Sequence, residues 1–213
     1  MYKLFLSHFS ALSLLTAVFS LATPTQAQNE EEPYAADRSK TWIYTISFET
    51  IGIDKEAAAQ EFIKDSAWSI NIDAEYFFTS TLSSSIGIGF LSYSDRAGFS
   101  QTVQSTFEGI STESSSADAL PIYAEFGYRN FFGHSNRAYW SARAGVSALA
   151  ASQRGIDNCS DCREEDIDID GGAYGLAGIG YRVGNTWSIG LQYKQYFSGD
   201  LENSVGLNFL LGL

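Results

Sequence analysis

Alternation between apolar and polar residues, repeated over eight segments of about ten residues, constrains this chain more than any other feature. In most segments one parity is apolar or aromatic, while the other is small, polar or charged. A two-residue period is typical of β-strands whose two faces meet different surroundings. The segments are Trp42 to Ile51, Trp68 to Phe78, Leu82 to Tyr93, Leu120 to Arg129, Ala138 to Ala150, Gly172 to Val183, Trp187 to Phe197 and Ser204 to Leu211.

The connections between these segments alternate in length. The long, polar connections are Gly52 to Ala67, Ser94 to Ala119 and Ala151 to Gly171. The short ones are Thr79 to Thr81, Asn130 to Arg137 and Gly184 to Thr186, and the last, Ser198 to Asn203, is intermediate. A tilted strand of about ten residues rises about 23 Å, close to the apolar band of about 25 Å in an outer-membrane barrel. The sequence therefore predicts an all-β fold, an eight-stranded antiparallel up-and-down transmembrane β-barrel.

The N-terminal residues have the composition of an export signal. Lys3 precedes the apolar stretch Leu4 to Leu21, and Thr25-Gln26-Ala27 places small residues where a signal peptidase cleaves. We expect a signal peptide at residues 1–27, a flexible periplasmic lead-in at 28–40 and the barrel domain at 41–213. A membrane anchor is the alternative for the first segment, and a partner-binding tail is the alternative for the second.

Net charge excludes one class of partner. The chain carries a formal charge of −12, so it has no electrostatic case for binding nucleic acid. Beyond the N-terminal segment, no stretch approaches the roughly 20 apolar residues that a membrane-spanning helix needs. Aromatic residues make up 15% of the chain and Gly is frequent, which favours strands and tight turns.

The four tryptophans lie at or near the ends of the predicted strands. Amphipathic rings prefer the headgroup level of a bilayer and gather there in two belts. The predicted belt residues are Trp42, Trp68, Trp140 and Trp187. The alternative, that these rings pack a soluble core, would require the opposite face of every strand to be solvated.

Charged residues fall on the inward parity of several strands. The interior of an eight-stranded barrel is only wide enough for side chains to fill, and charges there must pair. We therefore predict an ion-pair plug that closes the lumen, with a gated small conduit and an acid–base hydrolase as alternatives. The predicted members are Glu49, Asp73, Glu75, Glu125, Arg129, Arg143, Arg182 and Lys194.

Two features of one predicted long loop raise the question of a metal. Cys159 and Cys162 could form a redox pair, half of a zinc site or a small disulfide, and we favour the disulfide because four zinc ligands are not available. An acidic run follows, comprising Asp161, Glu164, Glu165, Asp166, Asp168 and Asp170. Calcium binding is one interpretation of this run, but the closing Glu of a dedicated calcium loop is absent, so we favour a solvated surface. We expect no cofactor and no resident metal.

No catalytic arrangement is predicted. His134 and Ser135 are adjacent in a predicted short turn, and His134 is the only His after residue 27, which leaves little for a Ser–His hydrolase. Gly178 and Gly180 do not form a nucleotide-binding fingerprint, because no helical pattern follows them. We interpret them as glycines that pack the barrel.

At the C-terminus, Ser204, Gly206 and Phe209 resemble the signal read by the outer-membrane assembly machinery, although Leu211 stands where a second aromatic residue is usual. The chain from Lys40 onward resembles the small eight-stranded outer-membrane β-barrel proteins, the OmpA-like and OmpX-like group. That resemblance implies monomers with a lumen filled by side chains. It also implies roles in envelope integrity or adhesion, with a narrow pore at most.

The sequence thus predicts an outer-membrane barrel with a structural or surface-interaction role and a plugged lumen. The alternatives are a narrow channel for water, ions or small solutes and, lower, a lipid-modifying enzyme. We expect outer-membrane lipids, lipopolysaccharide and the barrel assembly machinery as partners. The N-terminus is expected in the periplasm, with the long loops extracellular.

Overall fold

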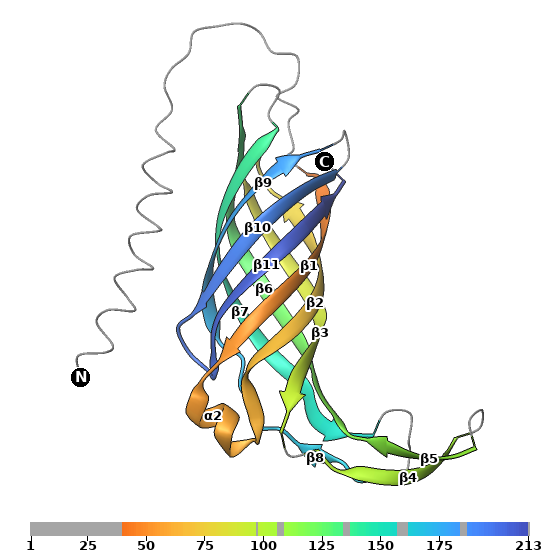
Figure 1. The fold of residues 1–213 in the computed structure, drawn as a ribbon. Coiled ribbons are helices and arrows are strands. Elements are labelled where there is room, and N and C mark those ends of the chain that lie inside the picture. The colour runs from red at the N-terminus through yellow and green to blue at the C-terminus, as the bar shows by residue number, and fades with distance from the viewer. Residues whose placement is uncertain are drawn as a thin grey trace, which may run out of the picture. The chain divides into compact units, whose positions relative to one another are not determined.

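Eight strands of the computed structural model close into one antiparallel barrel, which Figure 1 shows from the side. The structure describes residues 40–96, 98–105, 109–133, 137–156, 162–183 and 187–212. The barrel strands are β1 (Trp42–Ile53), β2 (Ile63–Phe77), β3 (Leu82–Asp95), β6 (Ser116–Phe132), β7 (Ala138–Gly155), β9 (Ala173–Arg182), β10 (Trp187–Tyr196) and β11 (Leu201–Leu211). Successive barrel strands pair with each other, and β1 pairs with β11 to complete the wall. The predicted fold class is confirmed, whereas the predicted signal peptide and nearly all of the lead-in lie outside the described residues.

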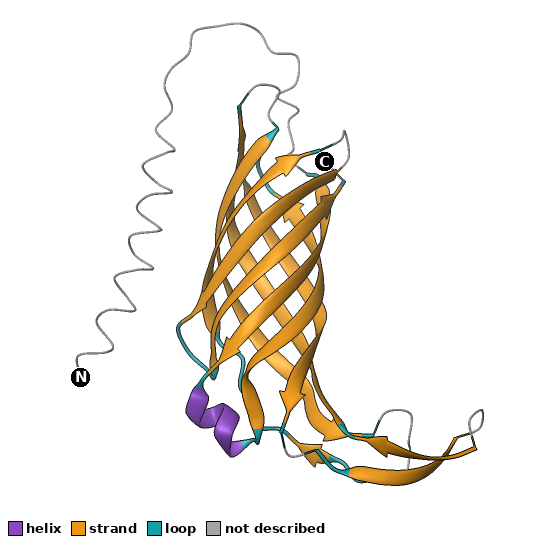
Figure 2. Ribbon diagram, viewed as in Figure 1, coloured by secondary structure: helices purple, strands orange, loops and turns teal. Residues whose placement is uncertain are grey.

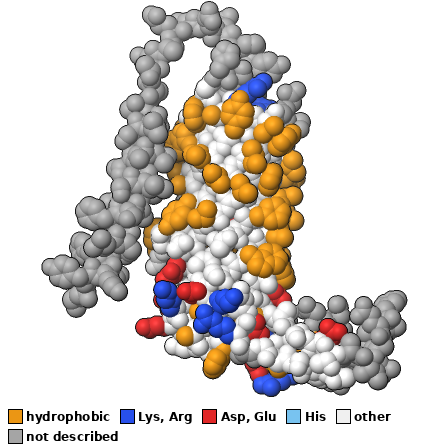
Figure 3. Space-filling view, viewed as in Figure 1, with side chains coloured by type: hydrophobic (Ala, Val, Ile, Leu, Met, Phe, Trp, Pro, Cys, Tyr) orange, Lys and Arg blue, Asp and Glu red, His pale blue; other side chains and the backbone are white. Residues whose placement is uncertain are grey.

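Each strand separates an apolar outer face from a polar inner face. In β1, Trp42, Tyr44 and Phe48 are exposed on the outside, whereas Thr45 and Glu49 are buried inside. The outward side chains form an apolar band on the wall, shown in orange in Figure 3. A register shift of one residue would turn inward carboxylates toward this band, so the pairing register is strongly specified.

The two ends of the barrel differ. We call the end where β2–β3, β6–β7 and β9–β10 are joined the turn end, and the opposite end the loop end. The predicted strand limits at the loop end are wrong: β2 begins at Ile63, β3 ends at Asp95, β6 begins at Ser116 and β7 ends at Gly155. The ladders continue past the apolar band, where both faces of a strand can be polar and the alternation that revealed the strands is lost.

A bulge in β7 changes which parity faces inward. Between Ala150 and Gln153, β7 has one residue more than its partner β6, and Ala151 in this stretch has φ 50°. Before the bulge odd positions such as Arg143 face inward, and after it even positions such as Arg154 do. The sequence prediction ended this strand at the bulge because the period is broken there.

Three of the connections at the loop end contain further secondary structure, seen in Figure 2. Helix α2 (Lys55–Gln60) follows β1, and Asp54 caps it by accepting hydrogen bonds from two first-turn amides. The hairpin β4 (Ser100–Ser105) and β5 (Gly109–Ser114) lies between β3 and β6, and β8 (Glu165–Asp166) pairs with β7. The sequence analysis predicted these three connections only as long and polar and did not identify these elements. No helix in the described ranges is long and apolar enough to cross a membrane.

Apolar side chains fill the inside of the barrel at both ends. The loop-end apolar cluster includes Ile53, Ile63, Leu91, Ile167, Ile169 and Leu201. The turn-end apolar cluster comprises Ile43, Phe77, Tyr139 and Leu210, with Phe131 packed against it. The polar middle of the lumen therefore lies between two apolar layers.

The acidic stretch from Asp166 to Asp170 contributes to the first of these layers. Ile167 and Ile169 are buried in the loop-end apolar cluster, while Asp166, Asp168 and Asp170 are exposed. Because Asp and Ile alternate, the Ile side chains pack inside the mouth of the barrel and the Asp carboxylates face solvent.

Candidate functional site: the ionic core of the lumen

The ionic core is the set of charged side chains that share the middle of the lumen. Its members are Glu49 of β1, Asp73 and Glu75 of β2, Glu125 and Arg129 of β6, Arg143 of β7 and Lys194 of β10. Their side chains point inward because each lies on the inner parity of its strand. They are all at least nine-tenths buried, so every charge here must be stabilised by its neighbours.

Arg143 and Arg129 hold two carboxylates together near the middle of the barrel. Arg143 Nη1 lies 3.0 Å from Glu125 Oε2, and Arg143 Nη2 forms an ion pair with Glu75. Arg129 Nη2 lies 3.0 Å from the second oxygen of Glu75. These ion pairs join β2, β6 and β7 across the lumen. They can hold the register of the three strands as well as fill the space between them.

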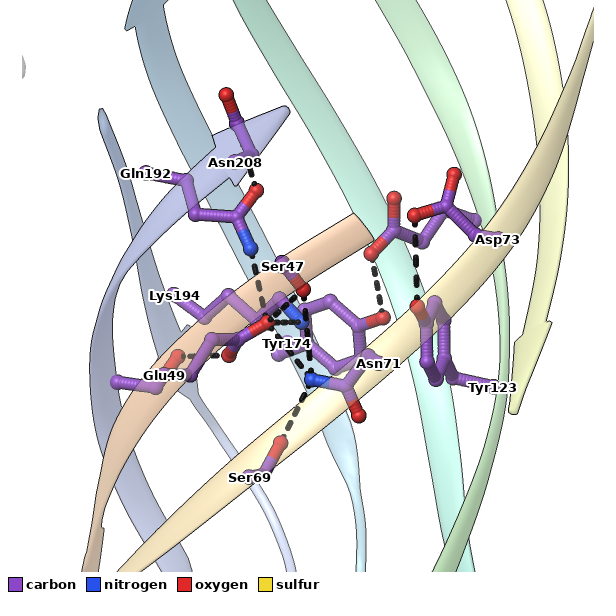
Figure 4. Close-up of polar contacts among 12 residues, drawn as sticks. Ser47, Glu49, Ser69, Asn71, Asp73, Tyr123, Tyr174, Gln192, Lys194 and Asn208 are labelled. Carbon is purple, nitrogen blue, oxygen red and sulfur yellow. Dashed lines mark hydrogen bonds and ion pairs between the residues drawn. The ribbon is translucent and has the colours of Figure 1, made fainter. Parts of the chain in front are cut away.

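Glu49 is the centre of a second group, drawn in Figure 4. Its Oε1 accepts from Lys194 Nζ at 2.9 Å and from Gln192 Nε2 at 2.8 Å. Asn71 Nδ2 donates to the same oxygen at 3.1 Å, and Ser204 Oγ donates to Oε2 at 2.7 Å. The carboxylate therefore has partners on both sides of the β1–β11 closure. Hydrogen bonds to a charged group are among the stronger ones in proteins, so Glu49 is expected to stabilise this closure.

Two tyrosines complete the ionic core. Lys194 Nζ lies 5.0 Å from the ring centroid of Tyr123 and 5.4 Å from that of Tyr174, distances suited to cation–π attraction. Tyr174 Oη donates to Glu125 Oε1 at 2.7 Å. Tyr174 and Leu176 are two large residues on the inner parity of β9. Both are buried inside the barrel, because a hydroxyl partner and the loop-end apolar cluster accommodate them.

Asp73 differs from the other carboxylates. It makes no ion pair with any described residue, and its one hydrogen bond is the long contact from Tyr123 Oη at 3.5 Å, also visible in Figure 4. Its Oδ1 atom is buried without a hydrogen-bond partner. The ionic core contains four carboxylates and three cations, so Asp73 is the acid left without a partner of opposite charge.

The predicted eighth member, Arg182, does not lie in the ionic core. It ends β9 at the turn end, where its backbone N–H donates to the Arg137 carbonyl at 2.7 Å. Side-chain parity placed it inward, but parity does not give the height of a residue along the barrel. Along the barrel axis, Arg182 lies at the level of the opening at the turn end.

The lumen retains two small cavities. One lies among Glu49, Asn71 and Ser147, and the other lies among Thr45, Asp73 and Ser141. Each has room for about one water molecule, and the side chains of Tyr123 and Lys194 line both. Neither of these two cavities has room for a molecule of substrate size.

A second ionic group, which the sequence prediction did not find, lies at the loop end. Buried Arg154 donates to Asp95 at 3.0 Å, to Glu165 at 3.2 Å and to the Glu61 carbonyl at 2.8 Å. One guanidinium thus joins the end of α2, the end of β3 and β8. The bulge at Ala151 hid this inward position in a segment that was predicted to be a loop.

The predicted belt residues all lie on the outer face. Trp42, Trp140 and Trp187 lie near the turn end, and Trp68 lies nearer the loop end. Three of these rings pack against other outward aromatic residues: Trp42 lies 5.0 Å from Tyr76, Trp68 lies 5.7 Å from Phe90 and Trp140 lies 5.1 Å from Tyr128, measured between ring centroids. This arrangement suits two interfacial levels on one apolar wall.

The three predicted assembly-signal residues lie on β11, where the barrel closes. Ser204 and Gly206 face inward near Glu49, and a Cβ atom on Gly206 would lie 2.6 Å from the Glu49 Cγ atom. Phe209 faces outward and packs edge-on against Phe48. These contacts give Ser204 and Gly206 a structural role in the folded barrel, beside any role in assembly.

The remaining candidates, for a metal site and for a catalytic pair, lie partly outside the described residues. No group of three or more His, Cys, Asp or Glu in the described part of the chain is placed to hold a metal ion. Cys159 and the segment His134-Ser135-Asn136 lie outside the described residues, so the pairing of Cys159 with Cys162 stays a prediction.

A closed eight-stranded wall with an apolar outside and an ionic inside defines the class of transmembrane β-barrels. The chain belongs to the outer membrane protein beta-barrel domain family, whose model matches residues 12–211. It is thus a small eight-stranded barrel of the bacterial outer membrane. No curated protein matches the chain.

Several solved structures are similar to this barrel. A de novo designed transmembrane β-barrel is 12% identical, with a TM-score of 0.46 and coverage of 82% of this chain and 97% of that chain. Neisserial surface protein A is 10% identical, with a TM-score of 0.47 and coverage of 81% and 96%. Ail, the attachment invasion locus protein of Yersinia pestis, solved with the heparin analogue sucrose octasulfate, is 9% identical, with a TM-score of 0.46 and coverage of 81% and 97%.

Proposed function

We propose that this protein is a non-enzymatic outer-membrane barrel with a structural or surface-interaction role and a lumen plugged by its own side chains. The layered lumen is the observation that carries the proposal. The ionic core lies between the loop-end and turn-end apolar clusters, and each of the two cavities described above admits about one water molecule. An ion that entered would have to cross two apolar layers, where an unpaired charge is costly.

Planar-bilayer recording of the purified full chain tests this proposal. We expect no discrete conductance steps, together with the heat-modifiable gel mobility of a folded barrel. Steps in the wild-type protein would instead favour the narrow channel for water, ions or small solutes, which the two water-sized cavities keep as the second candidate. Loss of an acyl chain from lipid A on expression would favour the lipid-modifying enzyme.

Orientation is part of the same proposal. We place the turn end and both termini in the periplasm and the loop end outside the cell, because long connections of such barrels are extracellular and short turns periplasmic. Protease digestion of intact cells should cut the loop-end connections and spare the turns. The reverse pattern would contradict this orientation.

The remaining proposals concern partners and covalent structure. We propose a monomer, inserted by the barrel assembly machinery and surrounded by lipids and lipopolysaccharide. We also propose that Cys159 and Cys162 form a disulfide that tightens an extracellular loop. Thiol alkylation with and without reductant, followed by mass measurement, should show two labelled thiols only after reduction.

A further inference from the structure

Three outward residues form a patch on the barrel wall just beyond the apolar band. Ile63 pairs with Asp95, and the Arg96 N–H donates to the Phe62 carbonyl at 2.9 Å, so Phe62 and Arg96 are cross-strand neighbours. Ile63 is fully buried inside, which turns the exposed Lys64 outward as well. We call Phe62, Lys64 and Arg96 the wall patch.

The height of the wall patch matches the headgroup layer of a bilayer. The outward pair Trp68 and Phe90 lies at the loop-end edge of the apolar band, and Trp68 pairs with Ser92. Arg96 is four residues further along β3, which at a rise of about 3.3 Å per residue and a tilt of about 45° is roughly 9 Å higher. Headgroups occupy about 5–8 Å beyond the hydrocarbon on each side, and a long cationic side chain can reach back into that layer.

Charge singles out this part of the surface. Four exposed cations lie at the loop end of the described residues. Three of them are close in the fold: Lys55 begins α2, Lys64 lies at the start of β2, and Arg96 follows the end of β3. The fourth, Arg163, stacks on Phe99 and pairs with Glu165. Figure 3 shows Lys and Arg side chains on the loop-end side of the orange band, with Asp and Glu side chains beside them. Glu61 and exposed Asp65 adjoin the patch in the chain and reduce its net charge, whereas Asp95, next to Arg96, pairs with Arg154.

Phe62 adds an independent observation. Its side chain is 62% exposed and its φ is 52°, in the left-handed region that a bulky residue rarely adopts. Such strain persists only where the surrounding structure imposes it, and it is concentrated at functional sites. Here it holds an aromatic ring outward at the level of the lipid headgroups.

We infer that the wall patch binds a phosphorylated glycolipid of the outer leaflet. Lys64 and Arg96 contact its phosphate groups, and Phe62 packs against the apolar part of its headgroup region. The inference rests on the orientation proposed above, because the loop end must face the outer leaflet. Each cation near an anionic lipid surface contributes about fivefold to binding.

Native mass spectrometry of the refolded full chain in zwitterionic detergent, mixed with rough-type lipopolysaccharide, tests the inference. We expect the double variant Lys64→Gln/Arg96→Gln to bind roughly 25-fold more weakly than wild type, from two cations at about fivefold each. Asp65→Asn should bind more tightly, and Arg163→Gln, which removes one cation elsewhere on the loop end, should bind as wild type does. Lipopolysaccharide stripped of its phosphates should be retained weakly by every form.

Several outcomes would overturn the assignment. These are unchanged binding by the double variant, an equal loss in Arg163→Gln, or equal retention of the dephosphorylated glycolipid. If phosphatidylglycerol is retained as tightly as lipopolysaccharide, the patch binds anionic lipids in general and the assignment of a glycolipid is overturned. Phe62→Asn fits the left-handed backbone, so it should fold at least as well as wild type and still bind more weakly. None of these measurements depends on conductance, so a failure here is distinct from a failure of the plugged lumen.

Discussion

Gly87 and Tyr123 are directly opposed across the β3–β6 ladder, and the tyrosine ring fills the space above the glycine. A Cβ atom on Gly87 would lie 2.2 Å from the Tyr123 Cζ atom. The same relationship recurs where Tyr139 lies over Gly180 and Gly190. Inward glycines therefore make room for the rings that fill the lumen.

Gly87→Ala should destabilise the barrel by about 1–3 kcal/mol, because the Tyr123 ring must leave its position to admit the methyl group. Urea titration in lipid or detergent, followed by gel mobility, measures the change in the free energy of unfolding. In a Tyr123→Ala background the same substitution should have a smaller effect, with a coupling of about 0.5–3 kcal/mol. Equal effects in both backgrounds would show that the ring is not the obstacle.

Arg143→Met should lower the free energy of unfolding by about 3–5 kcal/mol, because it leaves Glu75 and Glu125 buried with fewer cations. Arg163→Met is the control, since Arg163 is exposed and its loss should change stability by less than about 0.5 kcal/mol. Bilayer recording of the Arg143 variant shows whether it also conducts. If neither stability nor conductance changes, the ion-pair plug is contradicted.

Asp73→Asn should be neutral or stabilising, because the substitution keeps the shape of the side chain and removes the charge that lacks an ion pair. Glu49→Gln should cost about 1.5–3 kcal/mol, since it weakens the charged hydrogen bonds around Glu49. Both variants can be compared in one denaturant series. Equal losses would mean that the surplus of one carboxylate has no energetic consequence.

Arg154→Gln should loosen the loop end while leaving the membrane-spanning part intact. The guanidinium that joins α2, β3 and β8 would be lost, so amide hydrogens of α2 and β8 should exchange faster with solvent. Protection in the centres of β1 and β11 provides the internal control. A uniform rise in exchange along the chain would point to global destabilisation instead.

Alternation in the sequence was sufficient to predict the barrel, the faces of its strands and the inward charges within the apolar band. In β1 the outward Trp42 and the inward Glu49 lie where their parity placed them. This works because lipid on one side and a packed lumen on the other impose a strict two-residue period.

Other features could not be predicted for physical reasons. Parity gives no height, so Arg182 was grouped with charges that lie further along the lumen. Partners across the lumen depend on the stagger of all eight strands, which no local pattern encodes, so Asp73 was not recognised as the carboxylate without an ion pair. Beyond the apolar band the alternation of apolar and polar residues weakens. For that reason the inward position of Arg154 and the burial of Ile167 and Ile169 were not predicted.

Because β7 has an additional residue at Ala151, its inward positions change from odd to even residue numbers there. A saturation mutagenesis profile along this strand should therefore have its sensitive sites at odd numbers up to Leu149 and at even numbers from Ser152 onward. A single-residue deletion at Ala151 would remove the bulge and leave an unbroken two-residue period, in which Arg154 still faces inward and Gln153 still faces outward. The bulge thus accommodates one additional amino acid while the inward row of side chains, from Leu149 through Ser152 to Arg154, continues along the same face of the wall.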